Sequence, residues 1–113
     1  MASFSNPEPN LLVLEGEIDL SQSPALREQF RTLLEEKPPA LYVDLSLVRY
    51  IDSSGLAALI EAMQKVNQYG GHLALFGIRE NVRTIFQISR LDLVFRIFPD
   101  RESARAALEI REP

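Results

Sequence analysis

The sequence predicts an α/β fold built on a largely parallel sheet. Strand-like and helix-like segments alternate along the whole chain, and the helix-like segments are long enough to serve as crossovers between parallel strands. Hydrophobic residues make up 46% of the composition, which is enough for a core, and 113 residues is the length of one ordinary domain. We therefore predict a single-domain sandwich over residues 1–113, with a four- to five-stranded, mostly parallel sheet and four helices.

The first strand and helix are expected directly after a polar N-terminal segment. NLLVLEGEID (10–19) alternates as a strand does, and Gly16 indicates a bulge or a close approach. SQSPALREQFRTLLEEK follows with helical spacing of its apolar residues, with Ser23 expected as the N-cap and Pro24 at the first helical position. Two prolines then end this helix.

The middle of the chain predicts a buried strand followed by the longest helix. ALYVDLS (40–46) is rich in β-branched and aromatic residues, and LVRYI extends it toward the segment DSSGL. One stripe of apolar side chains then follows at helical spacing: Leu56, Leu59, Ile60, Met63 and Val66. The remaining elements are expected at 72–78 (strand), 81–89 (helix), 93–98 (strand) and 100–109 (helix).

The composition and the two ends of the chain exclude several classes of protein. Residues 1–9 are expected to be a flexible lead and residues 110–113 a frayed tail. The start of the chain lacks the pattern of a secretory signal, and no apolar run approaches the roughly 20 residues of a bilayer span. We therefore expect a cytoplasmic location without membrane insertion. The net charge of −4 and the dispersed basic residues argue against a nucleic-acid partner.

The candidate site lies at the carboxyl ends of the predicted strands, where sites of parallel sheets collect. Asp19, Asp44 and Asp52 are placed at or near such ends. Ser53 and Ser54 begin the central helix, where unpaired backbone N–H groups and the helix dipole favour an anion. A phosphate on Ser53 would therefore be tolerated by the fold. The alternative is that Asp52 or Ser53 only caps the helix.

Enzymatic and metal-binding alternatives lack the residues that they need. The one histidine, His72, is expected at the opposite end of the sheet from Ser53, and no G-x-S-x-G segment is present. A phosphoaspartate receiver would need a lysine after a later strand, but Lys37 and Lys65 are both placed on helices. One histidine without cysteine is a poor metal site, and no P-loop motif is present. We expect no catalytic residues, no metal and no cofactor.

Two long segments together resemble one protein family. LYVDLSLVRYIDSSGLAALIEAMQKVNQYGGHLALFGIRENVRTIFQISRLDLVFRIF and, upstream of it, LEGEIDLSQSPAL are similar to the STAS domain family, specifically to freestanding anti-sigma factor antagonists. The resemblance implies that the serine after the motif aspartate is phosphorylated by an anti-sigma factor of the GHKL kinase type. The unphosphorylated form binds that kinase and frees a sigma factor. By position the acceptor is Ser53, with Ser54 as the alternative, and Asp19 lies beside the Ser53 loop.

The resemblance also implies a surface for partners at the start of the central helix and along its exposed side. Small side chains such as Ala57 and Ala62 would let a partner approach closely, although alanines are also simply good helix formers. Glu61 and Lys65 are expected to form a solvated pair. The expected partner-binding residues are Asp19, Asp52, Ser53, Ser54, Gly55, Leu56, Ala58 and Glu61.

The expected partners are the kinase and a phosphoserine phosphatase, with the chain itself a monomer or weak dimer. The alternative function is a STAS scaffold or regulatory subunit of another complex, in lipid or anion transport or in a stressosome-like sensor, with DSSG as a docking loop only. One departure from the family pattern is Arg90, where glycine is common and relieves the strain of a positive φ.

Overall fold

Five strands form one sheet in the order β1-β2-β3-β4-β5 in the computed structural model, which describes residues 2–109. The strands span Ala2–Glu8 (β1), Leu11–Ile18 (β2), Ala40–Ile51 (β3), His72–Phe76 (β4) and Arg96–Phe98 (β5). β1 is antiparallel to β2, and every other neighbouring pair is parallel. The predicted mostly parallel sheet with four helices is confirmed.

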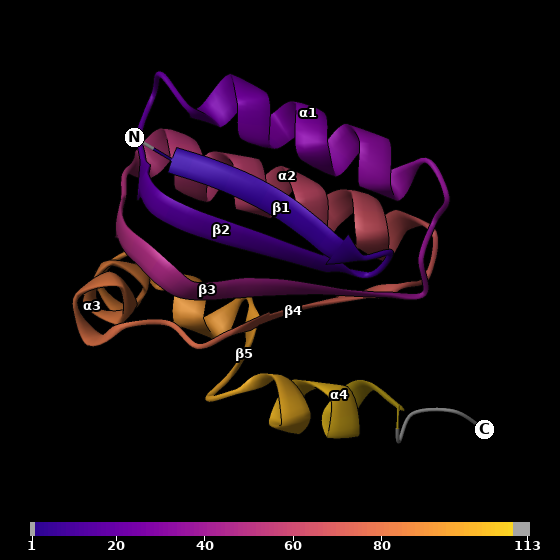
Figure 1. Ribbon diagram of the computed structural model, residues 1–113. Coiled ribbons are helices and arrows are strands. Elements are labelled where there is room, and N and C mark those ends of the chain that lie inside the picture. Colours follow the sequence, from indigo (N-terminus) through magenta and orange to yellow (C-terminus); the bar gives the residue numbers. More distant parts are fainter. Residues whose placement is uncertain (1, 110–113) are drawn as a thin grey trace.

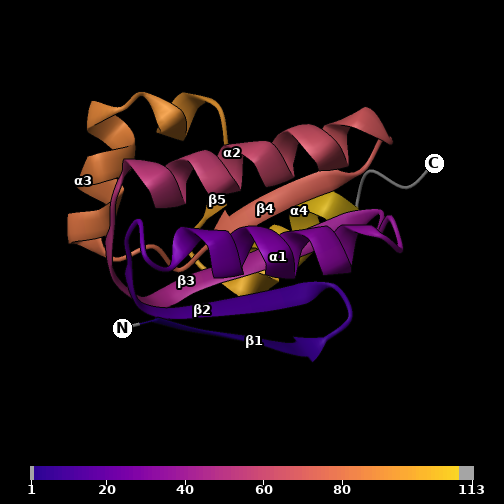
Figure 2. The same cartoon turned by 90° about the horizontal axis from the view of Figure 1, so that it is seen from above.

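The helices lie on both faces of this sheet. They are α1 (Ser23–Leu34), α2 (Ser53–Gln68), α3 (Glu80–Ile88), the 3₁₀ turn η1 (Leu91–Leu93) and α4 (Arg101–Glu109). α1 and α2 lie side by side on one face, α4 covers the other, and α3 lies at the end where α1 and α2 begin (Figure 1, Figure 2). The loops that follow β2 and β3 therefore meet at one end of the sheet.

The N-terminal residues expected to be a flexible lead instead form the edge strand β1. Ala2 and Phe4 are half-buried and pack on the core, while Ser3 and Ser5 point to solvent, which is the alternation of a strand. The pairing with β2 becomes irregular between Ser5 and Glu8, around Pro7. An edge strand tolerates proline because its outward N–H groups need no partner. The tail expected to fray, residues 110–113, lies outside the described residues.

β3 is one continuous strand that runs to Ile51 and carries two irregularities in its register with β2. One shift lies next to Gly16, whose φ of 95° confirms the predicted bulge. β4 ends at Phe76, which pairs with Asp44, so the last part of β3 has only β2 as a strand neighbour. Side chains from the start of α3 support it there, since Arg79 Nε donates to the Ser46 carbonyl at 2.9 Å.

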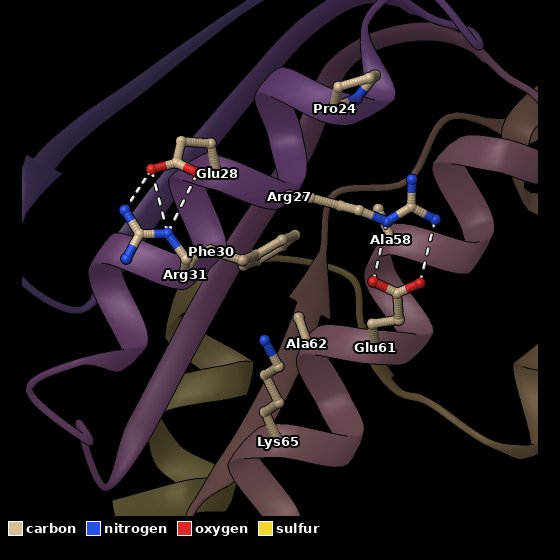
Figure 3. A pocket seen from close by; sticks show the side chains of 9 residues that line it. All are labelled: Pro24, Arg27, Glu28, Phe30, Arg31, Ala58, Glu61, Ala62 and Lys65. Carbon is tan, nitrogen blue, oxygen red and sulfur yellow. Dashed lines mark hydrogen bonds and ion pairs between the residues drawn. The ribbon is translucent and has the colours of Figure 1, made fainter.

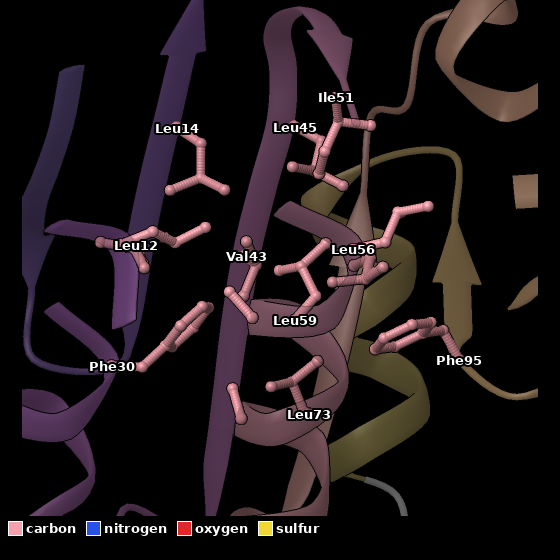
Figure 4. Packing of buried hydrophobic residues seen from close by; sticks show 14 of the residues in the cluster. Leu12, Leu14, Phe30, Val43, Leu45, Ile51, Leu56, Leu59, Leu73 and Phe95 are labelled. Atoms are coloured by element: carbon pink, nitrogen blue, oxygen red, sulfur yellow. The ribbon is translucent and has the colours of Figure 1, made fainter. Parts of the chain in front are cut away.

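The main core lies between the sheet and the layer of α1 and α2 (Figure 4). Alternate residues of β3 face this layer, among them Val43 and Leu45, and they meet Phe30 from α1 and Leu59 from α2. Each such side chain stabilises the fold by about 1.5–3 kcal/mol relative to exposure to water. A smaller cluster under α4 contains Leu11, Tyr42, Ala74, Phe76, Ala104 and Leu108.

The C-terminal elements differ from the predicted ones at their boundaries. The strand expected over 93–98 is shortened to β5, because η1 and the turn that follows it occupy residues 93–95. Arg90, between α3 and η1, has a φ of 62°, which confirms the positive φ that the family pattern predicts there. No helix within residues 2–109 has both the length and the apolarity that crossing a bilayer requires.

Candidate functional site

Asp52 is the N-cap of α2. Its backbone is extended (φ −102°, ψ −174°), and its Oδ1 accepts hydrogen bonds from the backbone N–H groups of Ser54 at 2.9 Å and Gly55 at 3.1 Å. These are two of the N–H groups that a helix leaves unpaired at its start, so the cap satisfies them. The capping role that the sequence offered to Asp52 or Ser53 therefore belongs to Asp52.

The two serines of the motif differ in what surrounds their hydroxyls. Ser54 is half-buried, and its Oγ donates to Asp52 Oδ1 at 2.6 Å. Ser53 is the first residue of α2 and is exposed, and within residues 2–109 its hydroxyl has no hydrogen-bond partner. The exposed hydroxyl is therefore the one that an approaching molecule can reach without breaking an internal hydrogen bond.

A second loop with the same local geometry lies beside the first. Asp19 Oδ1 accepts from the backbone N–H of Ser21 at 3.0 Å and from its Oγ at 2.6 Å. The two loops follow directly after paired residues, because Ile18 and Ile51 are partners in the sheet. The backbone N–H of Asp52 also donates to the Ile18 carbonyl at 3.1 Å. The predicted position of Asp19 beside the Ser53 loop is confirmed.

Both carboxylates are ionised at neutral pH. The Ser54 hydroxyl lowers the pKa of Asp52 below its ordinary value, and partial burial opposes this shift. Nearby backbone N–H groups, including the N–H of Leu20, lower the pKa further. The Ser21 hydroxyl and nearby backbone N–H groups lower the pKa of Asp19, while the charge of Asp52 opposes the shift. The exposed Ser53 hydroxyl thus lies at the positive end of a helix, with two negative side chains close by.

Asp44, which was grouped with these acids, lies elsewhere. It is in the middle of β3, and its Oδ1 accepts from the Ser46 backbone N–H at 2.9 Å and from its Oγ at 2.7 Å. β3 continues for seven residues beyond it, through the predicted extension LVRYI. Asp44 is therefore part of a bulge within the strand rather than of the loop site.

Several residues predicted for partner contact are buried. Gly55 is packed so closely that an added Cβ would lie 2.6 Å from Ile51 Cγ1 and 2.9 Å from Ile18 Cγ2. Leu56 is 7% exposed and Ala58 1% exposed. The prediction that Ala58 and Ala62 lie on the exposed side of the helix is wrong, because α2 packs against both the sheet and α1. These small residues let the two helices approach each other.

Glu61 is exposed and lies near enough to the predicted partner, Lys65, for that charge to help lower its pKa, but its hydrogen bonds come from another residue. It accepts two hydrogen bonds from Arg27 of α1, at 2.9 and 3.1 Å, and not from Lys65 (Figure 3). This pair spans a groove of about 340 Å³ between α1 and α2, in which Ala58 and Ala62 lie opposite Phe30. An exposed ion pair of this kind contributes little to the stability of a fold.

Residues suited to hydrolysis or to metal binding are not brought together. His72 pairs with Ala40 at the start of β3, whereas Ser53 follows the end of that strand, on the order of 30 Å away. Within residues 2–109, no three His, Cys, Asp or Glu side chains are placed to hold a metal ion. The arrangement can present a hydroxyl and two carboxylates to an approaching molecule.

Leu20 is the feature of this site that the sequence analysis did not identify. It lies between Asp19 and Ser21, and its side chain is 73% exposed. The sequence contains one signal for this exposure, namely an apolar residue between the aspartate and the serine of a turn. Such a turn directs the side chain of its middle residue outward.

The fold and the site define a small α/β domain that carries an exposed hydroxyl at the start of its central helix. The family model described as the STAS domain matches residues 5–104, and the chain belongs to this family. An anti-sigma-B factor antagonist of Listeria monocytogenes is 29% identical over 86 residues, which cover 76% of this chain and 75% of that protein.

Solved structures agree with this assignment. The crystal structure of an anti-sigma factor antagonist from Mycobacterium paratuberculosis has a TM-score of 0.84 at 26% identity, covering 96% of this chain and 95% of that chain. The Bacillus cell fate determinant SpoIIAA, in its phosphorylated form, shares the fold with a TM-score of 0.68 at 18% identity, covering 98% and 100%.

Proposed function

We propose that this chain is an anti-sigma factor antagonist controlled by phosphorylation of Ser53. In its unphosphorylated form it binds an anti-sigma factor that is also a serine kinase of the GHKL type, and a sigma factor is released. The observation that carries this proposal is the exposed, unpartnered hydroxyl of Ser53, next to the engaged hydroxyl of Ser54. Membership of the STAS family and the names of the relatives support it.

Phosphorylation would act on the complex rather than on the fold. A phosphate on Ser53 brings a charge of about −1.5 to −2 to the N-terminus of α2, which the helix dipole stabilises. The same charge adds to those of Asp19 and Asp52, so the loop becomes strongly negative. A partner carboxylate about 4 Å away would be repelled by about 1 kcal/mol per charge pair in water and about 4 kcal/mol at a dielectric constant of 20. These energies correspond to a weakening of about fivefold and about a thousandfold per charge pair.

The remaining parts of the proposal concern how the switch is set and reset and where it works. The domain meets ATP only through its kinase, and a phosphoserine phosphatase restores the binding form because the phosphate remains accessible. The switch works in the cytoplasm, with the chain as a monomer or weak dimer and without nucleic acid, catalysis or cofactor of its own. Asp19, Asp52, Ser53 and the accessible part of Ser54 form the binding surface, which the two neighbouring loops share.

The test is a reconstitution with a panel of GHKL-type anti-sigma kinases from the same organism. We expect the wild-type chain to bind one of them and to incorporate phosphate from ATP. Ser53→Ala should bind but accept no phosphate, and Ser53→Asp should bind at least tenfold more weakly. Ser54→Ala is the matched control and should still accept phosphate.

Unchanged binding and phosphate incorporation in both Ser53 variants would contradict the proposal. That result would favour the alternative in which the DSSG segment is a docking loop in another complex. Phosphate incorporation that is lost in Ser54→Ala and kept in Ser53→Ala would move the acceptor to Ser54.

A further inference from the structure

We propose that Leu20 is an apolar contact residue by which the kinase partner recognises the Ser53 loop. This inference rests on the proposed function and adds to it a recognition element outside the phosphorylated motif. Leu20 is 73% exposed at the end of the sheet that carries Ser53. The Leu20 side chain enters an apolar pocket of the kinase, next to the site where that kinase binds the serine.

The backbone around Leu20 has the same hydrogen-bonding pattern as the backbone around Ser53. In each loop an aspartate Oδ1 accepts from the N–H and the Oγ of the serine two residues later. The distances are 3.0 and 2.6 Å in the loop with Asp19, and 2.9 and 2.6 Å in the loop with Asp52. The middle residues of the two turns, Leu20 and Ser53, are both left exposed.

The two turns are also joined to each other. The backbone N–H of Asp52 donates to the Ile18 carbonyl at 3.1 Å, and the carbonyl of Leu20 accepts from Ser23 Oγ at 3.3 Å. The backbone N–H of Leu20 is also near enough to the Asp52 carboxylate to help lower its pKa. These contacts make Leu20 a neighbour of the Asp52–Ser53 turn. A protein that reaches the Ser53 hydroxyl therefore meets the Leu20 side chain as well.

The position of Leu20 favours contact with an apolar pocket on the partner. The neighbouring side chains are two ionised carboxylates and hydroxyls, so Leu20 is the one large apolar group that the two turns present. Removing a leucine side chain from water on binding strengthens a complex by about tenfold or more. The ordering cost is small because the turn is already held in place.

The two large apolar side chains that are more exposed than Leu20 lack this relation to Ser53. Leu93 is 75% exposed and Ile88 78% exposed, but they belong to η1 and α3. No hydrogen bond within the described residues joins either of them to the Asp52–Ser53 turn. Leu93 therefore serves as a control that matches Leu20 in residue type and in exposure.

The experiment measures phosphate incorporation and binding with the kinase panel, using the wild-type chain, Leu20→Asn, Leu20→Met and Leu93→Asn. We expect Leu20→Asn to raise the KM for the protein substrate about tenfold with kcat within twofold, because Ser53 itself is unchanged. Leu20→Met should restore the wild-type KM, and Leu93→Asn should equal wild type. Urea unfolding of all four proteins checks that none has lost stability.

The outcomes separate this inference from the proposed function. A wild-type chain that no kinase binds or phosphorylates overturns both. A phosphorylated wild type with Leu20→Asn within twofold of it overturns the role of Leu20 alone. An equal loss in Leu93→Asn overturns it too, since the effect then belongs to exposed leucines in general. Self-association that depends on Leu20, with an unchanged KM, also overturns the inference, because Leu20 then contacts a second copy of the chain and not the kinase.

Discussion

At the residue scale, the Asp52 carboxylate gives two adjacent serines different environments. It holds the Ser54 hydroxyl at 2.6 Å and leaves the Ser53 hydroxyl exposed. A kinase that used Ser54 would have to break this short hydrogen bond to a charged group, which is worth roughly 1.5–3 kcal/mol. We therefore expect phosphorylation at Ser53 to be favoured by at least tenfold in rate.

The same carboxylate contributes to stability, so its removal has a measurable cost. We expect Asp52→Ala to lower the free energy of unfolding by about 1 kcal/mol, because two N–H groups of α2 lose their cap. Asp52→Asn keeps a capping oxygen and should lose less. Urea denaturation measures both, and Asp92→Ala, at an exposed acid in η1, should stay within about 0.5 kcal/mol of wild type. An Asp52→Ala variant as stable as wild type would contradict the capping role.

The charge of Asp52 predicts how this effect depends on pH. The pKa of Asp52 is lower in the folded protein than its ordinary value of 3.8, so the ionised form stabilises the fold. That contribution is fully present above the pKa of the unfolded chain and is lost as the pH falls through the lower folded value. The difference in unfolding free energy between wild type and Asp52→Asn should therefore be constant from pH 7 to about pH 5 and shrink below about pH 4. A difference that grows on acidification would contradict this sign.

The residues of the site were only partly predictable from the sequence. The spacing in DSSG placed a cap and a hydroxyl at the start of a helix, because such residue types are strongly preferred there. It could not decide between Asp52 and Ser53 as the cap, since both types serve equally well. The burial of Ala58 was not predictable either, because the position of α1 against α2 depends on the packing of the whole layer.

At the element scale, the end of α3 stores strain that a substitution can relieve. Arg90 adopts φ 62° and ψ 17°, a left-handed conformation that costs a residue with a side chain about 1 kcal/mol. We expect Arg90→Gly to raise the free energy of unfolding by about 0.5–1 kcal/mol. The matched control is Arg83→Gly, an exposed position inside α3, which should lower it by about 1 kcal/mol. Destabilisation by Arg90→Gly would show that the Arg90 side chain makes a stabilising contact.

The start of α2 depends on a close contact with the sheet. An added Cβ at Gly55 would meet the side chains of Ile51 and Ile18 at under 3 Å, so either these side chains or α2 would have to shift. We expect Gly55→Ala to destabilise the domain by about 1–3 kcal/mol, although alanine favours the helix. Thermal unfolding measures this change. A stabilised Gly55→Ala variant would mean that the two isoleucines repack without cost.

The helices and strands were largely predictable from the sequence, except for the strand β1. Periodicity identified the helices and parallel strands to within a few residues, because their apolar faces repeat regularly. β1 was missed because Pro7 and Pro9 indicated a loop, and the pairing of Ala2–Glu8 with β2 is a contact between segments that no local pattern reveals. A proline is acceptable there only because β1 lies at the edge of the sheet.

At the scale of the whole molecule, the topology gathers the loop of Asp19, the loop of Ser53 and α3 at one end (Figure 1). His72 lies at the other end of the same sheet, because β3 and β4 are parallel. An ion pair between Arg101 of α4 and Glu8 of β1 joins the last helix of the described residues to the first strand. The alternation of strands and helices predicted the parallel sheet but not the place of β1 within it.

This arrangement predicts that the modified form keeps the fold. Ser53 is exposed and makes no contact that its modification would break, so Ser53→Asp should shift the thermal midpoint by no more than a few degrees. Circular dichroism during heating measures this shift. A large drop in the midpoint would contradict a switch that acts only on the partner.

The most direct test of the central claim is phosphopeptide mass spectrometry on the chain recovered from its own cells, with and without stress. Trypsin cleaves after Arg49 and Lys65, so a single peptide carries both serines and fragmentation distinguishes them. The account predicts phosphate on Ser53, in an amount that changes with the condition. An unmodified peptide recovered in good yield under every condition, or phosphate confined to Ser54, would contradict it.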